Sequence, residues 1–145
     1  MERRFFNPSQ PQTMQVAVFL LYANVVVALL FRSGGQGIFA AAANVFLRAG
    51  PPYSAATLIG TLVAVAVVAG SAGAAYLIAN EKRFGWRLGV AVAAAPLVAV
   101  VLVVLIGSPR VSILNIDPIG LMFDIALFAL LLHTQTRAYE KLWFK

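Results

Sequence analysis

Asp124 is the only ionisable side chain deep inside a long apolar stretch of this sequence. Two polar side chains on other apolar stretches, Asn24 and Thr61, lie at a similar depth, about 10 Å from the segment end for a helix that rises 1.5 Å per residue. A carboxylate in hydrocarbon has a high free energy unless other helices supply hydrogen bonds. The spacing predicts an intramembrane polar layer of Asp124, Asn24 and Thr61, in which Asp124 accepts from Asn24.

Two interpretations of Asp124 stay open. It can be a structural link between helices, where such hydrogen bonds contribute about 0.6–2 kcal/mol. It can also be a site that takes up a proton or a cation during transport. Transport routes usually contain several ionisable groups, and the only other nearby acid, Asp117, is explained by a capping role.

The residues predict no cofactor and no metal site, because the chain has no cysteine and a single histidine, His133. We expect His133 to be an interfacial side chain near a helix C-terminus; the alternative is a ligand to a cofactor shared with another subunit. We expect no enzyme activity, since no nucleophile–base set or paired carboxylates are apparent. A membrane enzyme is a minor alternative, with its chemistry in outer loops at Gln36, Asn44, Arg48, Asn115 and Asp117.

The composition indicates whether the surface of this protein faces water or lipid. The 145 residues are 61% hydrophobic and 11% charged, with a mean hydropathy of +0.88. Soluble domains carry about 25% charged residues, so this chain has too few charges to cover a water-exposed surface. The sequence predicts an all-α integral membrane protein with residues 1–145 as one domain, and it excludes a nucleic-acid partner because there is no basic stripe with stacking residues.

Four segments are long enough to cross a bilayer core of about 30 Å: residues 14–31, 54–79, 88–107 and 118–138. The apolar stretch 36–47 is too short, so we expect a short interfacial or re-entrant helix between the first and second spans. The sequence therefore predicts a four-transmembrane-helix bundle. Thr13 and Ser54 are expected to cap the first and second spans, and Asp117 with Pro118 to start the fourth.

The distribution of Lys and Arg predicts the orientation. Eight of these residues lie in the N-terminus, in the loop between spans two and three, and in the tail, and the remaining three lie on the other side: Arg32, Arg48 and Arg110. The side richer in basic residues is cytoplasmic. Both termini are therefore expected to be cytoplasmic, in a bacterial plasma membrane.

Small residues on spans two and three predict how the helices pack. Gly70, Gly73, Gly85 and Gly89 allow close approach of two backbones, and the short loop between the spans favours an antiparallel hairpin. Bundle packing and an oligomer contact are both compatible with this pattern. Pro96 is expected to kink the third span.

The tail, residues 134–145, is predicted to be an amphipathic extension at the interface. Arg137 lies on one helical face, and Tyr139 and Trp143 lie on another. These residues can anchor the tail in the membrane surface or form a docking strip for a partner.

Both ends of the chain resemble small four-helix membrane proteins of actinobacteria. The resemblance lies in Phe5-Phe6-Asn7-Pro8-Ser9-Gln10-Pro11-Gln12-Thr13, in Phe123-Asp124, in Leu132-His133-Thr134-Gln135-Thr136-Arg137 and in Trp143-Phe144-Lys145. It implies a plasma-membrane location in a high-GC bacterium. It transfers no activity and no functional residue.

The residues favour a non-catalytic accessory or scaffold subunit of a larger bacterial membrane complex, with a respiratory or transport assembly as the host. The expected partners are membrane lipid and other membrane subunits or a second copy. The alternative is a small homo-oligomeric transporter or channel that couples to a proton or ion through Asp124.

Overall fold

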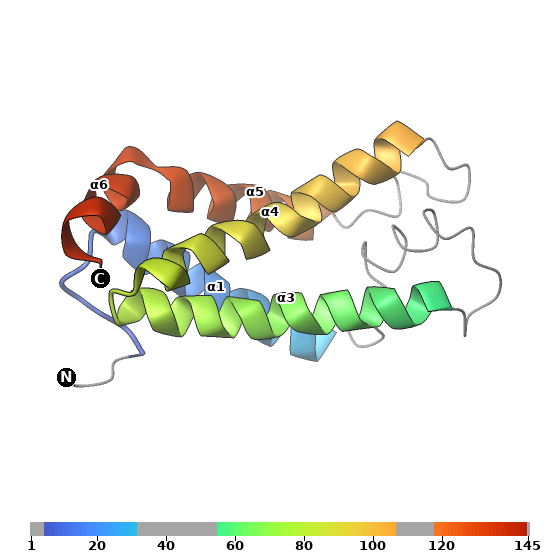
Figure 1. The fold of residues 1–145 in the computed structure, drawn as a ribbon, viewed down its shortest axis with the longest axis horizontal. Coiled ribbons are helices and arrows are strands. Elements are labelled where there is room, and N and C mark those ends of the chain that lie inside the picture. Colours follow the sequence, from blue (N-terminus) through green and yellow to red (C-terminus); the bar gives the residue numbers. More distant parts are fainter. Residues whose placement is uncertain (1–4, 32–54, 107–117, 145) are drawn as a thin grey trace.

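The computed structural model describes residues 5–31, 55–106 and 118–144, which form five helices and no strand. Four helices run along the length of the molecule (Figure 1): α1 (Gln12–Phe31), α3 (Ala55–Ala79), α4 (Arg83–Ile106) and α5 (Pro118–Leu132). The short α6 (Thr134–Trp143) lies at the end that carries both termini. The predicted all-α class is confirmed.

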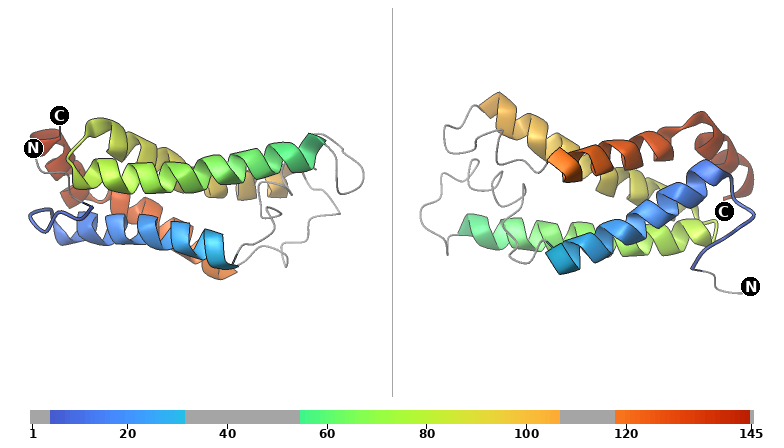
Figure 2. Two further views of the ribbon diagram at one scale, coloured as in Figure 1. Left: turned by 90° about the horizontal axis from the view of Figure 1, so that it is seen from below. Right: turned by 180° about the vertical axis from the view of Figure 1, so that it is seen from behind.

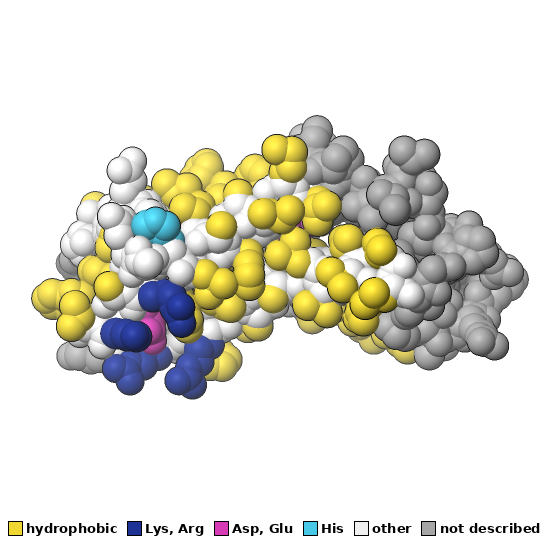
Figure 3. Space-filling view, turned by 90° about the horizontal axis from the view of Figure 1, so that it is seen from above, with side chains coloured by type: hydrophobic (Ala, Val, Ile, Leu, Met, Phe, Trp, Pro, Cys, Tyr) yellow, Lys and Arg dark blue, Asp and Glu magenta, His cyan; other side chains and the backbone are white. Residues whose placement is uncertain are grey.

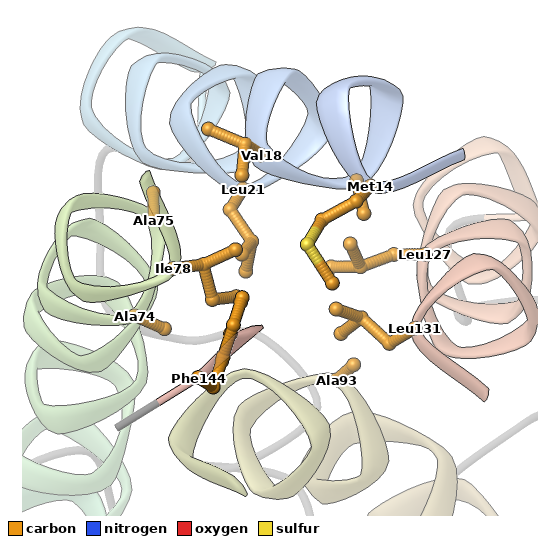
Figure 4. Close-up of a cluster of buried hydrophobic side chains, with 11 residues drawn as sticks. Met14, Val18, Leu21, Ala74, Ala75, Ile78, Ala93, Leu127, Leu131 and Phe144 are labelled. Carbon is orange, nitrogen blue, oxygen red and sulfur yellow. The ribbon is translucent and has the colours of Figure 1, made fainter. Parts of the chain in front are cut away.

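The four long helices surround one apolar core. Helix α1 packs against α3 and α5, and α4 packs against the same two helices. Their inward side chains point toward one another in the space between the helices (Figure 4). The cluster consists of Met14, Ala17, Val18, Leu21, Ala74, Ala75, Ile78, Ala93, Leu127, Leu131 and Phe144.

Two of the described helices are long and apolar enough to cross a membrane, in the segments Thr61–Ala79 and Arg83–Leu102. The described apolar segments of α1 and α5 are shorter, Gln12–Val27 and Gly120–Leu132. The structure therefore supports two candidate spans and does not confirm four. Figure 2 shows all four helices lying side by side in the bundle.

The turn between α3 and α4 is three residues long, and Glu81 in its middle has a positive φ of 58°. The amide N of Lys82 donates to the Leu77 carbonyl at 2.9 Å, and that of Glu81 donates to the Ile78 carbonyl at 3.0 Å. These two bonds and the left-handed residue form a Schellman ending for α3. Helix α4 then starts at Arg83, five residues before the predicted span. The first turns of the helix lie outside the apolar stretch, and the long side chains of Arg83 and Arg87 are exposed there.

Two predicted helix ends are wrong. Helix α1 starts at Gln12, and the Pro11 carbonyl accepts from Met14 at 2.9 Å and from Gln15 at 3.0 Å, so Thr13 lies inside the first turn and is not its cap. Helix α5 begins at Pro118 as expected but ends at Leu132 rather than 138. Thr134 and Thr136 favour a break after Leu132, because a threonine hydroxyl can bond to a backbone carbonyl, as that of Thr136 does to Leu130. The predicted cap Ser54, Asp117 and the short helix 36–47 lie outside the described residues.

The bundle has two unlike halves. The terminal half comprises residues 5–21, 71–93 and 127–144, and it contains the whole apolar cluster. The open half comprises the described residues 22–31, 55–70, 94–106 and 118–126. Helices α3 and α4 lie close at their turn and separate toward the open half (Figure 1). Helix α4 passes through Pro96 without interruption.

Candidate functional site

Asp124 lies on the inner face of α5 and is only 7% exposed. The buried Leu127 and Leu131 follow it at helical spacing on the same face, while its neighbours Phe123 and Ile125 are exposed. Asp124 therefore faces the interior of the bundle. It is one of three buried side chains among those described in the open half, with Pro96 and Ala99.

The other two members of the predicted polar layer differ from Asp124 in burial. Asn24 on α1 is half-buried, whereas Thr61 on α3 is exposed. Asp124 and Thr61 are each engaged with other groups. The hydrogen bond from Asn24 to Asp124 stays a prediction.

The four predicted packing glycines lie where α3 meets α4. A Cβ added at Gly70 would be 2.8 Å from Val92 Cγ2, and one added at Gly89 would be 3.2 Å from Ile78 Cδ1. At Gly85 the added atom would meet the Leu77 Cβ and lie 2.7 Å from the Ile78 amide N. At Gly73 it would be 3.8 Å from Leu88 Cδ2, an ordinary contact. The backbones are thus closest at Gly85, beside the α3–α4 turn.

Glu81 connects three segments that are far apart in the sequence. Its Oε1 accepts from the Asn7 Nδ2 at 3.1 Å and from the Tyr139 hydroxyl at 2.9 Å. Asn7 is itself fixed, because its Oδ1 accepts from the Ser9 hydroxyl at 2.6 Å and from the Ser9 amide at 3.1 Å. The Glu81 network, defined as Asn7, Glu81 and Tyr139, ties the N-terminal segment and α6 to the α3–α4 turn.

Buried amides join the N-terminal segment to the bundle a second time. Gln10 is 4% exposed, and its Nε2 donates to the Ile78 carbonyl at 2.7 Å. Gln15 Nε2 donates to the Gln10 carbonyl at 2.6 Å and to the Pro8 carbonyl at 3.0 Å. These bonds fix the segment before α1 against the last turn of α3, where the Ile78 carbonyl also accepts from the Glu81 amide.

The C-terminal segment is held by three further contacts. The buried Thr136 hydroxyl donates to the Leu130 carbonyl at 2.8 Å and contacts the Thr13 hydroxyl at 3.1 Å. Arg83 Nε donates to the Phe144 carbonyl at 2.9 Å, and Trp86 Nε1 donates to the Leu131 carbonyl at 3.1 Å. Phe144 is 3% exposed and fills the end of the core. The terminal half is therefore closed by hydrogen bonds between segments as well as by apolar packing.

Tyr139 has a perturbed acid–base equilibrium. Partial burial raises the pKa of its phenol above the ordinary value of 10.0. The hydrogen bond to Glu81 raises this pKa further because it needs the phenolic proton, and the charge of Glu81 adds to the effect because it would repel a phenolate. The phenol therefore stays protonated and donates to Glu81 throughout the neutral range.

His133 has a more specific position than expected. It lies just past the end of α5 and is the N-cap of α6, where its Nδ1 accepts from the Gln135 amide at 3.3 Å. Among the described residues, no group of three or more His, Asp or Glu side chains could hold a metal ion. The outer-loop residues Gln36, Asn44, Arg48, Asn115 and Asp117 lie outside the described residues.

The predicted docking residues of the tail divide between two faces of α6. Tyr139 points inward to Glu81 and stacks on Trp143 with ring centroids 6.1 Å apart, while Arg137 and Trp143 are exposed. Sequence reasoning missed Asn7, Gln10, Glu81 and Thr136. The available signal was the presence of amide and acid side chains next to Pro residues or between two apolar segments.

The fold and the site define an all-helical protein with two helices able to cross a membrane. Comparisons with protein-family models, with curated proteins and with solved structures found no match.

Proposed function

We propose that this chain is a four-helix integral membrane protein that acts as a non-catalytic subunit of a larger bacterial plasma-membrane complex. Helix α1, with 20 residues, reaches about 30 Å and packs against α3, which contains one of the two candidate spans. Helix α5 reaches about 22 Å in the described residues, and the polar α6 follows it. In this arrangement, the end with both termini faces the cytoplasm, in keeping with its basic residues.

One observation carries the proposal: α3 presents a lateral face in the open half that no other described helix covers. Leu62, Val65, Ala66 and Ala69 follow one another at helical spacing and are all exposed. Large side chains beside small ones suit close packing of another membrane helix, because lipid tails provide no hydrophobic drive and contact depends on shape. On α4, the exposed Val98, Val101 and Leu105 form a second such stripe. A host, respiratory or transport, would bind here.

The test is purification of the tagged full chain from its native membrane in a mild detergent. We expect larger subunits to co-elute in a fixed ratio. Ala66→Leu should remove them by filling the space for the partner backbone, whereas Ala91→Leu, at an exposed position on α4 in the terminal half, should not. A particle that contains only copies of this chain would contradict the proposal.

The burial of Asp124 favours a second candidate, a small homo-oligomeric transporter or channel coupled to a proton or cation. Asp124→Asn would then abolish coupled flux in proteoliposomes. In a scaffold the amide still forms hydrogen bonds, so the same variant should assemble normally. Flux by the purified wild-type chain that is lost in Asp124→Asn would favour the transporter.

A further inference from the structure

The end of the molecule that carries both termini has a concentrated positive charge. The five Lys and Arg side chains that the structure describes are all exposed there, and Figure 3 shows basic side chains (dark blue) gathered at this end. They are Lys82, Arg83, Arg87, Arg137 and Lys141. Within the described part of the chain only Glu81 and Glu140 are acids at this end, so the positive charge is in excess.

No ion pair among the described residues neutralises this charge. Glu81 uses its Oε1 for the uncharged donors Asn7 and Tyr139. Among the described residues, the one polar contact of a basic side chain is the bond from Arg83 Nε to the Phe144 carbonyl. That bond holds the start of α4 against the end of α6. A carbonyl carries no formal charge, so the Arg83 guanidinium has no acidic partner among the described residues.

Four of the cations form two pairs with four-residue spacing. Arg83 and Arg87 lie on one face of α4, and Arg137 and Lys141 lie on one face of α6. Side chains at this spacing are neighbours, and like charges there repel and destabilise a helix. An anion that sits between the cations removes this repulsion, so the arrangement is favourable when an external anionic group is present.

Large exposed apolar side chains border the cations on both helices. Phe84 follows Arg83 and is 66% exposed, and Leu142 and Trp143 follow Lys141 and are 79% and 59% exposed. A small soluble anion such as inorganic phosphate has no apolar part to contact these side chains. A ligand with a negatively charged head and apolar chains satisfies both groups, because the aromatic and aliphatic side chains enter the bilayer below the headgroups.

We infer that the two basic pairs of α4 and α6 form a binding surface for anionic phospholipid headgroups, with Phe84, Leu142 and Trp143 against the acyl chains. This inference rests on the proposed membrane location, and it names the lipid class that the protein selects. Arg87, Arg137 and Lys141 provide the selectivity. Arg83 contributes its charge and also positions the end of α6.

Lipid retention by the full chain tests the inference. Protein in a mild detergent is given equal amounts of phosphatidylglycerol and phosphatidylcholine with identical chains, and the retained lipids are counted by native mass spectrometry. We expect phosphatidylglycerol to be preferred at least tenfold, since each basic residue near a headgroup contributes about fivefold. The triple variant R87Q/R137Q/K141Q should keep a preference of about fivefold at most, because Arg83 remains. R110Q, a charge change predicted to lie on the opposite side, should keep the wild-type preference.

Equal retention of the two lipids by the wild type, or an unchanged preference in the triple variant, overturns the inference. So does displacement of phosphatidylglycerol by inorganic phosphate or by a short oligonucleotide, which would indicate a soluble anion as the ligand. If the triple variant does not fold, the wild-type preference is measured against salt; it must fall as ionic strength rises, because screening weakens exposed charges.

The outcome is separable from the proposed function. Co-elution of larger subunits without a lipid preference overturns only the lipid surface. A lipid preference in a particle without such subunits overturns only the accessory role.

Discussion

The two halves of the bundle are stabilised differently. In the terminal half, eleven apolar side chains form one cluster, and hydrogen bonds join the N-terminal segment, the α3–α4 turn and α6 around it. In the open half, many large side chains of α3 and α4 are exposed; Leu58 is 66% exposed, Leu62 is 68% exposed and Leu105 is 74% exposed. The same helices therefore change from mutual packing to outward contact along their length.

Because of this difference, we expect the terminal half to determine the stability of the fold and the open half to determine association. A half that satisfies its own polar groups and buries its own apolar surface can hold the fold without help. A half with outward apolar stripes depends on its surroundings, lipid or a partner helix, to cover them. Substitutions in the terminal half should therefore change the stability of the isolated chain, and substitutions in the open half should change association.

The largest effect is expected at Gly85. Gly85→Ala places a Cβ against Leu77 and within 2.7 Å of the Ile78 amide N, so the α3 and α4 backbones must separate. We expect the free energy of unfolding to fall by about 3 kcal/mol, at the upper end for overpacked cores. Thermal unfolding in detergent measures this. Gly73→Ala is the matched control, because its Cβ would lie 3.8 Å from Leu88 Cδ2 and should have little effect.

A leucine in each half tests the comparison directly. Leu131 is fully buried, so Leu131→Ala should lower the free energy of unfolding by about 2–3 kcal/mol through loss of packing. Leu62→Ala in the open half should change it by less than about 0.5 kcal/mol, as exposed sites do. The readout is the unfolding midpoint of both variants in the same detergent. Equal losses would show that the two halves are not different.

The apolar parts of this architecture could be predicted from sequence, because helix length and composition depend on local residues. The start of α5 at Pro118 and the α3–α4 hairpin with its glycines are local signals of this kind. The Glu81 network could not be predicted from sequence, since its hydrogen bonds join residues that are 74 and 58 positions apart. The contact between Thr13 and Thr136 could not be predicted for the same reason, because 123 positions separate the two residues. The sequence predicts only a local role for Thr13, as a helix cap, whereas Thr13 lies in the first turn of α1.

A smaller loss is expected when the Glu81 network is broken. Glu81→Ala removes the acceptor for Asn7 and Tyr139 and should lower the free energy of unfolding by about 1–2 kcal/mol. Glu81→Gly should lose less, because glycine adopts the positive φ of this position without strain. A double-mutant cycle with Tyr139→Phe checks the assignment: the two losses should not add. Fully additive losses would mean that the two side chains act independently.

The smallest effect is expected from pH. The pKa of Tyr139 is raised in the folded protein, so its hydrogen bond to Glu81 contributes in full below the ordinary value of 10.0. The contribution disappears as the pH rises through the higher folded value, when the phenolate repels the carboxylate. The difference in unfolding temperature between wild type and Tyr139→Phe should be constant near neutrality and should shrink, then reverse, in strong alkali. Because both proteins share their Lys and other Tyr groups, this difference isolates Tyr139. A difference close to zero at every pH would show that Tyr139 stabilises α6 only by packing on Trp143 and Phe144, because phenylalanine keeps the ring.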